Sequence, residues 1–365
     1  MQQSSPRSPS DAMKSHEPTM QDIADRAQLA RCTVSRALRN HPAVTKETRE
    51  RVHAIARQLG YRPNPLVTAL MSRVRKALPK ETQPIIAYLT AFPQRYGWKA
   101  YFSLSEFFEG ALRRCETNGF RLEHFWLGDV DMNWTRMGEI LHARGIPGII
   151  LAPLPYPYPE PLLPWEHFAV AALGHTTRAI PSHRATNNQF FSLQIALERL
   201  TALGYRRVGL VLHNVEDIRV MHNFRGAFSV YQSKLKPQEK VKPHLPLRLN
   251  KDDFLAWYLR EMPDVILALE PKIKIWLKEA GLRIPTDVAY AFLATHPGSS
   301  NAGMDPQSQH VAAAAVDLVV SQLHRNEFGL PQTPKTVSID GVWVDGATAP
   351  LKHSVPRSGN LLRTG

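Results

Sequence analysis

The chain has 365 residues, is 43% hydrophobic and carries a formal net charge of +13 at pH 7. This length allows a small domain beside a large core domain, and the charge favours a polyanionic partner. Two cysteines, Cys32 and Cys115, are too few for a disulfide framework. No apolar run is long enough to span a bilayer, and the Ser- and Pro-rich residues 1–17 lack the apolar core of a secretory signal. We therefore expect a cytoplasmic protein with a disordered lead-in over 1–17.

Three short helices are predicted in a domain over residues 18–63. Thr19 can cap the first helix in an arrangement close to a capping box, and the second helix spans 31–39 after a tight break. The third helix can be capped by Thr45 and ends at Gly60. Two helices joined by a short turn and braced by a third form a helix-turn-helix, whose second helix enters the major groove of DNA.

The distribution of charge agrees with this interpretation. Residues 1–76 contain 14 Lys and Arg and 6 Asp and Glu, a surplus of +8 that is most of the chain's +13. On the second helix, Arg31, Arg36 and Arg39 alternate with apolar positions. A basic face on this helix is what a duplex binder requires, although a solvated basic face on a small helical bundle remains the alternative.

Two consecutive stretches carry a specific similarity. DIADRAQLARCTVSRALRN (22–40) and VTKETRERVHAIARQLGYRPNPLVTAL (44–70) resemble the DNA-binding headpiece of the lactose/galactose repressor (LacI/GalR) family. The resemblance covers about 50 residues. It implies a sequence-specific transcriptional regulator, a repressor, that binds a near-palindromic operator as a homodimer and is associated with the nucleoid. It departs from the family at Gln28 (usually glycine), Ala30 (usually serine) and Arg39 (usually asparagine), so we expect a less rigid turn.

The family's contacts transfer position by position. Thr19, Met20, Ser35 and Thr45 are implied to touch phosphates, which fixes register without reading sequence. Bases are implied to be read by Arg31 and Arg36, which can each grip a guanine, with Cys32 beside them. The complete implied set of DNA-binding residues is Thr19, Met20, Gln21, Arg31, Cys32, Thr33, Ser35, Arg36, Arg39, Thr45 and Leu70.

Residues 64–83 are expected to form a hinge helix and a basic linker. Asn64-Pro65 followed by Leu66 to Leu70 resembles the family's hinge helix. There, Leu70 is implied to wedge into the central base step of the operator from the minor groove. The alternative is that Leu70 is an ordinary apolar linker residue.

Alternating strands and helices predict a second domain over 84–346 with doubly wound parallel sheets. Strands are expected at 84–89, 120–127, 148–152, 168–173, 207–212, 264–269 and 288–293. Helices are expected at 102–118, 137–144, 190–203, 224–234, 272–280 and 309–324. Residues 347–365 read as a disordered tail.

This domain also resembles the family, at RGIPGII (144–150), LGYRRVG (203–209), GAF (226–228) and AGLRIPTDV (280–288). The similarity implies a two-lobed, periplasmic-binding-protein-like fold for effector binding and dimerisation. Lobe 1 is expected at about 84–180 and 294–327, and lobe 2 at about 181–293 and 328–346, with crossings near residues 180, 293 and 328. The fold class is therefore a small all-α helix-turn-helix domain joined by a hinge helix to an α/β two-lobed domain.

A ligand is expected between the lobes, at the C-terminal ends of the strands. The family's polar ligand-gripping residues are not preserved, because Asn223, Glu270 and Thr295 stand near positions that usually hold Arg, an Asn-Asp pair and Asp. Aromatic residues in the site loops can stack on sugars, or simply pack. A carbohydrate effector is the expectation, and the candidate residues are Phe92, Trp98, Tyr156, His175, Asn187, Arg219, Asn223, Glu270 and Thr295.

Catalytic chemistry finds no support in the sequence. The histidines show no metal-ligand spacing, and neither a GxSxG elbow nor a phosphate-binding glycine loop occurs. We expect no enzyme activity, no metal and no cofactor. Two alternatives to an effector-controlled repressor stay open. One is a regulator with a degenerate cleft, which acts without a small molecule or through a protein partner. The other is a solute-binding protein, disfavoured by the helix-turn-helix and the missing export signal.

Overall fold

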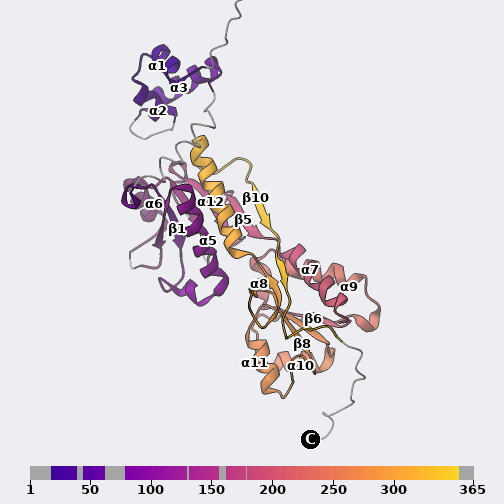
Figure 1. Cartoon of the computed structure of the whole chain (residues 1–365). Helices are drawn as coiled ribbons and strands as arrows, with labels where there is room; N and C mark the ends of the chain where they lie inside the picture. The colour runs from indigo at the N-terminus through magenta and orange to yellow at the C-terminus, as the bar shows by residue number, and fades with distance from the viewer. Residues whose placement is uncertain are drawn as a thin grey trace, which may run out of the picture. The chain divides into compact units, whose positions relative to one another are not determined.

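The computed structural model describes residues 18–38, 44–61, 79–129, 131–155, 162–177 and 179–352. Elements carry the labels of Figure 1. The chain divides into a small helical unit at the N-terminus and a large α/β unit. Among the described residues, none of the helices has the length and apolar character needed to cross a membrane.

The helical unit consists of three helices around a small apolar core. They are α1 (Met20–Ala27), α2 (Arg31–Leu38) and α3 (Lys46–Leu59). Each contributes a fully buried residue, namely Ile23, Val34 and Val52. The predicted capping box is present: Thr19 N donates to Asp22 Oδ2 over 2.6 Å, and Asp22 N to Thr19 Oγ1 over 3.4 Å. Helices of this length are marginal alone, so their stability comes from the shared core.

The turn between α1 and α2 has a residue in the left-handed region. Gln28 has φ 52° and ψ 45°, and its N–H group bonds the carbonyls at the end of α1. A second contact braces this end, because Arg51 Nη2 of α3 donates to Ala27 O over 3.2 Å. A Cβ atom in the left-handed region costs about 1–2 kcal/mol, so the turn carries strain that glycine would avoid.

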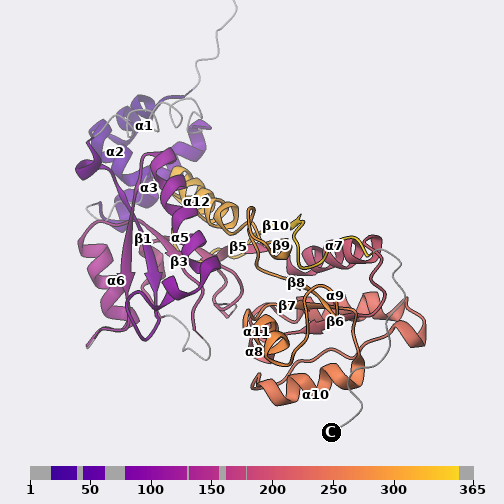
Figure 2. The same cartoon turned by 60° about the horizontal axis from the view of Figure 1, so that its bottom comes forward.

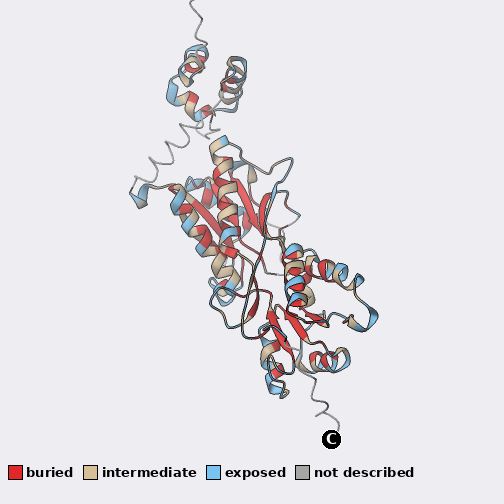
Figure 3. Cartoon of the chain, turned by 45° about the vertical axis from the view of Figure 1, so that its right-hand side comes forward, coloured by how far each residue is buried: buried red, intermediate tan, exposed pale blue. Residues whose placement is uncertain are grey.

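The first lobe of the α/β unit is built on a six-stranded parallel sheet in the order β10-β5-β4-β3-β1-β2. Its strands are β1 (Ile85–Thr90), β2 (Arg121–Trp126), β3 (Gly148–Leu151), β4 (Ala169–Leu173), β5 (His183–Asn187) and β10 (Thr336–Ile339). One face packs against α5 (Phe102–Asn118) and α12 (Ser308–Arg325), and the other against α6 (Trp134–Ala143). Figures 1 and 2 show this layering, and Figure 3 shows the strands buried.

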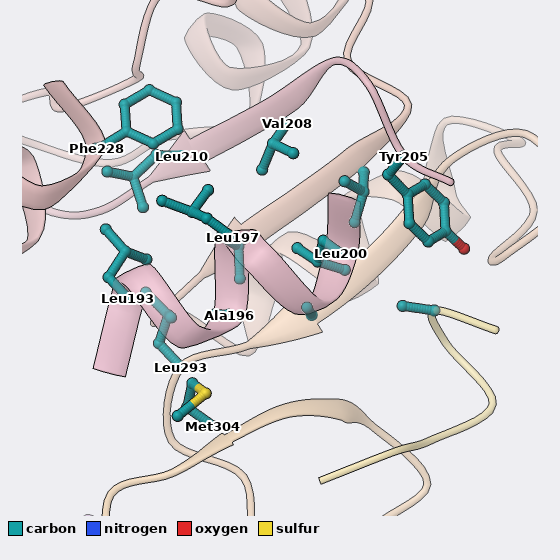
Figure 4. Close-up of a cluster of buried hydrophobic side chains, with 14 of the residues drawn as sticks. Leu193, Ala196, Leu197, Leu200, Tyr205, Val208, Leu210, Phe228, Leu293 and Met304 are labelled. Carbon is teal, nitrogen blue, oxygen red and sulfur yellow. The ribbon is translucent and has the colours of Figure 1, made fainter. Parts of the chain in front are cut away.

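The second lobe has a five-stranded sheet in the order β11-β9-β8-β7-β6, parallel except for the β9–β11 pair. Its strands are β6 (Val208–Val211), β7 (Val265–Ala268), β8 (Ala289–Phe292), β9 (Ala302–Asp305) and β11 (Val342–Val344). One face packs against α7 (Gln189–Ala202) and α9 (Asn223–Ser233), as Figure 4 shows, and the other against α10 (Lys251–Glu261) and α11 (Lys272–Glu279).

Shorter helices lie in the connections. They are α8 (Asn214–Arg219), η1 (Lys80–Thr82), η2 (Gly97–Ala100), η3 (Trp165–His167) and η4 (Pro237–Glu239). The predicted fold class, a helical domain followed by two lobes with doubly wound sheets, is confirmed.

The predicted lobe boundaries need correction. The crossings expected near 180, 293 and 328 each come one strand too early, because β5 and β10 belong to the first sheet and β9 to the second. These strands have weak sequence signals because β5 carries ionisable residues and neither β9 nor β10 is a continuous apolar run. The expected disordered tail is also wrong for residues 347–352. Ala349 is buried in the second lobe, and Lys352 N donates to Leu203 O over 2.8 Å.

In the first lobe, a cluster of aromatic side chains packs between β1, β2, α5 and η2. Trp98 lies with its ring centroid 5.1 Å from Phe108 and 5.7 Å from His124, and Tyr88 packs 5.2 Å from Phe108. His124 Nε2 lies 2.7 Å from Thr90 Oγ1. Burial and the neighbouring cations Arg95 and Lys99 lower the pKa of His124 to about 4.

The strained turn makes a first prediction. Gln28→Gly should stabilise the helical unit by about 0.5–1 kcal/mol, because glycine adopts a positive φ without steric cost. Hydrogen exchange of the α1 and α2 amides should slow several-fold. Gln58→Gly is the control, since Gln58 is exposed on right-handed α3 and should lose about 1 kcal/mol. Faster exchange in both variants would contradict the strain at Gln28.

The aromatic cluster makes a second prediction, about pH. The unfolded chain takes up a proton on His124 near its ordinary pKa of 6.5, whereas the folded chain resists protonation until about pH 4. Stability that His124 supports should therefore be present above pH 6.5 and lost as the pH falls towards 4. Thermal unfolding of wild type and His124→Gln across this range measures the effect. The wild type should lose more stability on acidification, and parallel curves down to pH 4 would rule out this role.

Candidate nucleic-acid interface and effector site

Helix α2 divides into a buried side and a solvent side. Val34 and Ala37 are completely buried against α1 and α3, whereas Arg31, Cys32 and Arg36 are exposed. At about 100° per residue, the three exposed positions fall on one side of the helix, opposite the buried pair. The sequence thus places two guanidinium groups on a solvent-facing side of a helix that the other two helices hold from behind.

Contacts around α2 fix its orientation. Tyr61 follows α3 and is half-buried. Burial raises its pKa while the charge of Arg31 opposes that shift, so its ring lies near the start of α2. Burial and the cations Arg57 and Arg49 lower the pKa of His53, and a hydrogen bond with Ala37 opposes this. Near its end, α2 is thus hydrogen-bonded to α3 through Ala37 and His53, and the charge of Arg31 at its start acts on Tyr61 after α3.

The remaining predicted DNA contacts lie at helix starts or on α2. The Thr19 hydroxyl donates to Asp22 Oδ2 over 2.7 Å, so it serves α1 as a cap, while Met20 and Gln21 form the first turn of that helix. Thr45 caps α3 by accepting from Thr48 N over 3.3 Å. Thr33 and Ser35 are half-buried on α2. Arg39 and Leu70 lie outside the described residues.

The predicted effector residues of lobe 1 follow strands of the first sheet, but two of them serve packing. Phe92 and Trp98 are 8% and 3% exposed. The Phe92 carbonyl accepts from Trp126 Nε1 over 2.7 Å, and Trp98 belongs to the aromatic cluster. The expectation that their faces meet a ligand is therefore wrong. Aromatic surface near this strand end is instead offered by Tyr96 and Tyr101, at 53% and 60% exposed.

The other lobe 1 candidates keep polar atoms at the strand ends. His175 follows β4 and is half-buried, and burial together with the charge of Arg184 lowers its pKa. Asn187 ends β5, and its Nδ2 donates to the carbonyl of Pro306. Tyr156 lies outside the described residues.

In lobe 2, the expectation that Thr295 contacts the effector is also wrong. It is 1% exposed, and its hydroxyl donates to Asn301 O over 3.1 Å inside the β8–β9 connection. Arg219 ends α8 and Asn223 begins α9, both after β6, while Glu270 follows β7; all three are half-buried. These three remain at the C-terminal ends of parallel strands, where ligands of such sheets bind.

Sequence reasoning missed two buried polar groups. Asp217 is completely buried, with Oδ2 2.8 Å from His222 Nδ1 and 3.3 Å from Arg225 Nε. It also accepts from Arg225 N over 3.2 Å, so it holds the start of α9, where Asn223 lies. The second group surrounds Arg184 in β5. Neither group has a motif, and only its burial distinguishes it. In the described part of the chain, no set of three or more His, Cys, Asp or Glu could hold a metal ion.

Comparison with known proteins agrees with this architecture. Residues 19–64 match the family model for bacterial regulatory proteins of the lacI family. Over 48 residues the chain is 48% identical to the HTH-type transcriptional repressor CytR of Escherichia coli K12. That match covers 13% of this chain and spans only 14% of the length of CytR. The ribose operon repressor of Haemophilus influenzae is 21% identical over 281 residues, which is 74% of this chain and 80% of that protein.

Solved structures share the fold. The complex of the transcriptional regulator CelR with cellobiose has a TM-score of 0.54 at 16% identity, covering 91% of this chain and 100% of that one. The lac repressor dimer bound to operator and the anti-inducer ONPF has a TM-score of 0.53 at 16% identity, covering 92% and 100%. Residues 19–64 of this chain therefore match the lacI family of bacterial regulatory proteins, and the α/β unit has the fold of the lac repressor.

Proposed function

We propose that this protein is a sequence-specific DNA-binding transcriptional regulator, a repressor, that binds a near-palindromic operator as a homodimer. The observation that carries the proposal is the solvent side of α2, where Arg31, Cys32 and Arg36 stand opposite the buried Val34 and Ala37. A major groove accepts such a helix, and arginine can donate two hydrogen bonds to guanine O6 and N7. The names of CytR and of the operator-bound lac repressor support the same activity.

Phosphate contacts would hold α2 in the groove. The first-turn amides of α1, at Met20 and Gln21, have no partners within the helix and can face a phosphate, as can the start of α3 after Thr45. Thr33 and Ser35 would bind beside the bases. Arg39 and Leu70 remain part of the proposal, as a further phosphate contact and as the minor-groove wedge.

A small molecule, a carbohydrate, is proposed to bind between the two lobes and to modulate DNA binding. Support comes from His175, Asn187, Arg219, Asn223 and Glu270, all placed at or after the C-terminal ends of strands. The cellobiose complex of CelR is a solved example of this fold with a sugar. An effector that favours one lobe orientation would change operator affinity by its difference in affinity for the two states. Tyr156 is the remaining aromatic candidate.

The relatives are regulators rather than enzymes, and a cytoplasmic location on the nucleoid is part of the proposal. The alternative regulator, which acts without a small molecule or through a protein partner, rests on the departures at Asn223 and Glu270. It predicts the same DNA binding with an effector site that does not respond to sugars.

Arg36→Ala should lower affinity for the operator by about 1–3 kcal/mol and affinity for random DNA much less, because it removes a base contact. The operator is first selected from a random duplex library, and both affinities are then measured at one salt concentration. Arg136→Ala is the control, since it removes an exposed arginine from α6 in the α/β unit. Equal losses on both DNAs would remove Arg36 from base reading, and equal binding of the wild type to both would overturn the proposed activity.

Thermal unfolding against a library of mono- and oligosaccharides, with purines as controls, tests the effector. A ligand at a hundredfold over its dissociation constant should add about 2.7 kcal/mol to the stability of the α/β unit. A hit should be weakened by Glu270→Gln and should change operator affinity. A library without hits would favour the alternative regulator and would leave the DNA-binding proposal standing.

A further inference from the structure

The first lobe contains a buried cation without an acidic partner. Arg184 is the second residue of β5, lies opposite Ala172 of β4, and is only 8% exposed. Its Nη1 donates to Gly174 O over 2.7 Å and its Nη2 to Thr177 O over 3.5 Å. Within the described ranges, no carboxylate forms an ion pair with it. Burial alone lowers its pKa, as expected where no negative charge lies close.

Such an arrangement is energetically unfavourable as it stands. Removing a guanidinium from water is costly unless anions or several hydrogen bonds replace the water. The two carbonyls use only part of its N–H donors, and the contact with Thr177 O is at the limit of hydrogen-bond length. Some N–H donors of the guanidinium are therefore left without an acceptor among the described residues, in a site that excludes water.

Two buried hydroxyl groups in the connection between β4 and β5 are also without partners in the described structure. Thr177 is 1% exposed and Ser182 is 0% exposed, and neither Thr177 Oγ1 nor Ser182 Oγ has a hydrogen bond in the described structure. Thr177 contacts Arg184 through its own carbonyl. Ser182 lies one residue before β5, towards the N-terminal ends of the strands, so of the two residues only Thr177 contacts the guanidinium. Buried hydroxyls normally find a partner, so the Thr177 hydroxyl has hydrogen-bonding capacity that the described structure does not use.

The cluster lies at the sheet edge where the effector is proposed to bind. Gly174 and Thr177 belong to the connection that follows β4, at the C-terminal end of that strand. His175, between them, is half-buried, and its pKa is lowered by burial and by the charge of Arg184. The partly exposed His175 and Thr176 form the side of the cluster that faces solvent.

We propose that Arg184 and Thr177 form an anion-binding subsite that accepts a carboxylate or phosphate group, with His175 at its mouth. The guanidinium would take two oxygens of the anion side by side, and the Thr177 hydroxyl would donate to one of them. The proposal rests on the proposed function where it adds that this anion belongs to the effector, which would then be a sugar acid or a sugar phosphate rather than a neutral sugar.

The competing role for Arg184 is structural. As a bracket, it would hold the 174–177 connection in place through its hydrogen bonds to the carbonyls of Gly174 and Thr177. The two roles differ in their response to removal of the charge. An unpaired buried charge destabilises the folded chain, so its replacement by an apolar side chain of similar length is neutral or stabilising when no anion is present. A bracket, in contrast, leaves two carbonyls unsatisfied when it is removed.

The experiment is titration of the full chain with inorganic phosphate, gluconate, glucose 6-phosphate and glucose. Calorimetry measures the binding, and thermal unfolding measures its effect on stability. Arg184→Met and Thr177→Val are the test variants. Arg113→Met is the matched control, because Arg113 is an exposed arginine of lobe 1 bonded to Gln309. We expect at least one anion to bind the wild type and Arg113→Met while glucose does not. Binding should weaken by about tenfold or more in both test variants, and Arg184→Met without anion should unfold no earlier than the wild type.

Three results decide the proposal. Unchanged anion binding in Thr177→Val and Arg184→Met, or no binding of any of the three anions, overturns the subsite. A lower unfolding temperature of Arg184→Met, with the response to anions retained, identifies the bracket and also overturns it. Tight binding of gluconate or glucose 6-phosphate with weak binding of phosphate assigns the anion to an effector, and the reverse order assigns it to a free anion. Operator selection is a separate assay, so failure of the proposed DNA binding would be recognised independently.

Discussion

The α/β unit depends on three adjacent chain crossings between its two sheets. The side chain of Asn187 donates to the carbonyl of Pro306, and Asn188 Nδ2 donates to Asp340 Oδ1 over 2.8 Å, so each crossing is bonded to another. A Cβ atom at Gly341 would lie 2.7 Å from Ser192 Oγ and 3.1 Å from Asp305 O, which makes glycine necessary there. Strands β5, β9 and β10 end at these segments, and Asn187, one residue of the proposed effector site, lies at the first of them. A change in lobe orientation would therefore alter the hydrogen bonds of Asn187 and Asn188.

The helical unit meets a different constraint, because its size limits the core it can build. Two of its helices have eight residues each, and one buried apolar cluster holds all three. Caps at Thr19 and Thr45 and the contact between Arg51 and Ala27 satisfy backbone groups that the core cannot. Because contacts within the unit satisfy these groups, the arginines on the exposed side of α2 are not needed for that purpose. The caps and the core hold the unit together, so a small unit can expose a charged helix face.

Buried polar groups in the α/β unit differ in a way that bears on function. Asp217 has cationic neighbours on two sides and serves to position α9. Gln322 is 2% exposed and exchanges hydrogen bonds with both backbone groups of Val170, so it joins α12 to the centre of the first sheet. Arg184 differs from both, since its charge is only partly compensated, by hydrogen bonds to two backbone carbonyls. The fold explains the two satisfied groups, whereas Arg184 is the group on which the proposed anion subsite rests.

The sequence by itself determined the helical unit, including its caps, its turn and the exposed positions of α2. Those features depend on neighbours within a few residues, so spacing and residue type were sufficient. It also indicated the alternation of strands and helices and most of their positions. Only the tertiary structure decided that Trp98 and Thr295 are buried, that β5 with its Arg184 is an inner strand, and that residues 347–352 pack on the second lobe. Strand pairing and side-chain burial join residues far apart in the chain, and local patterns carry no record of those partners.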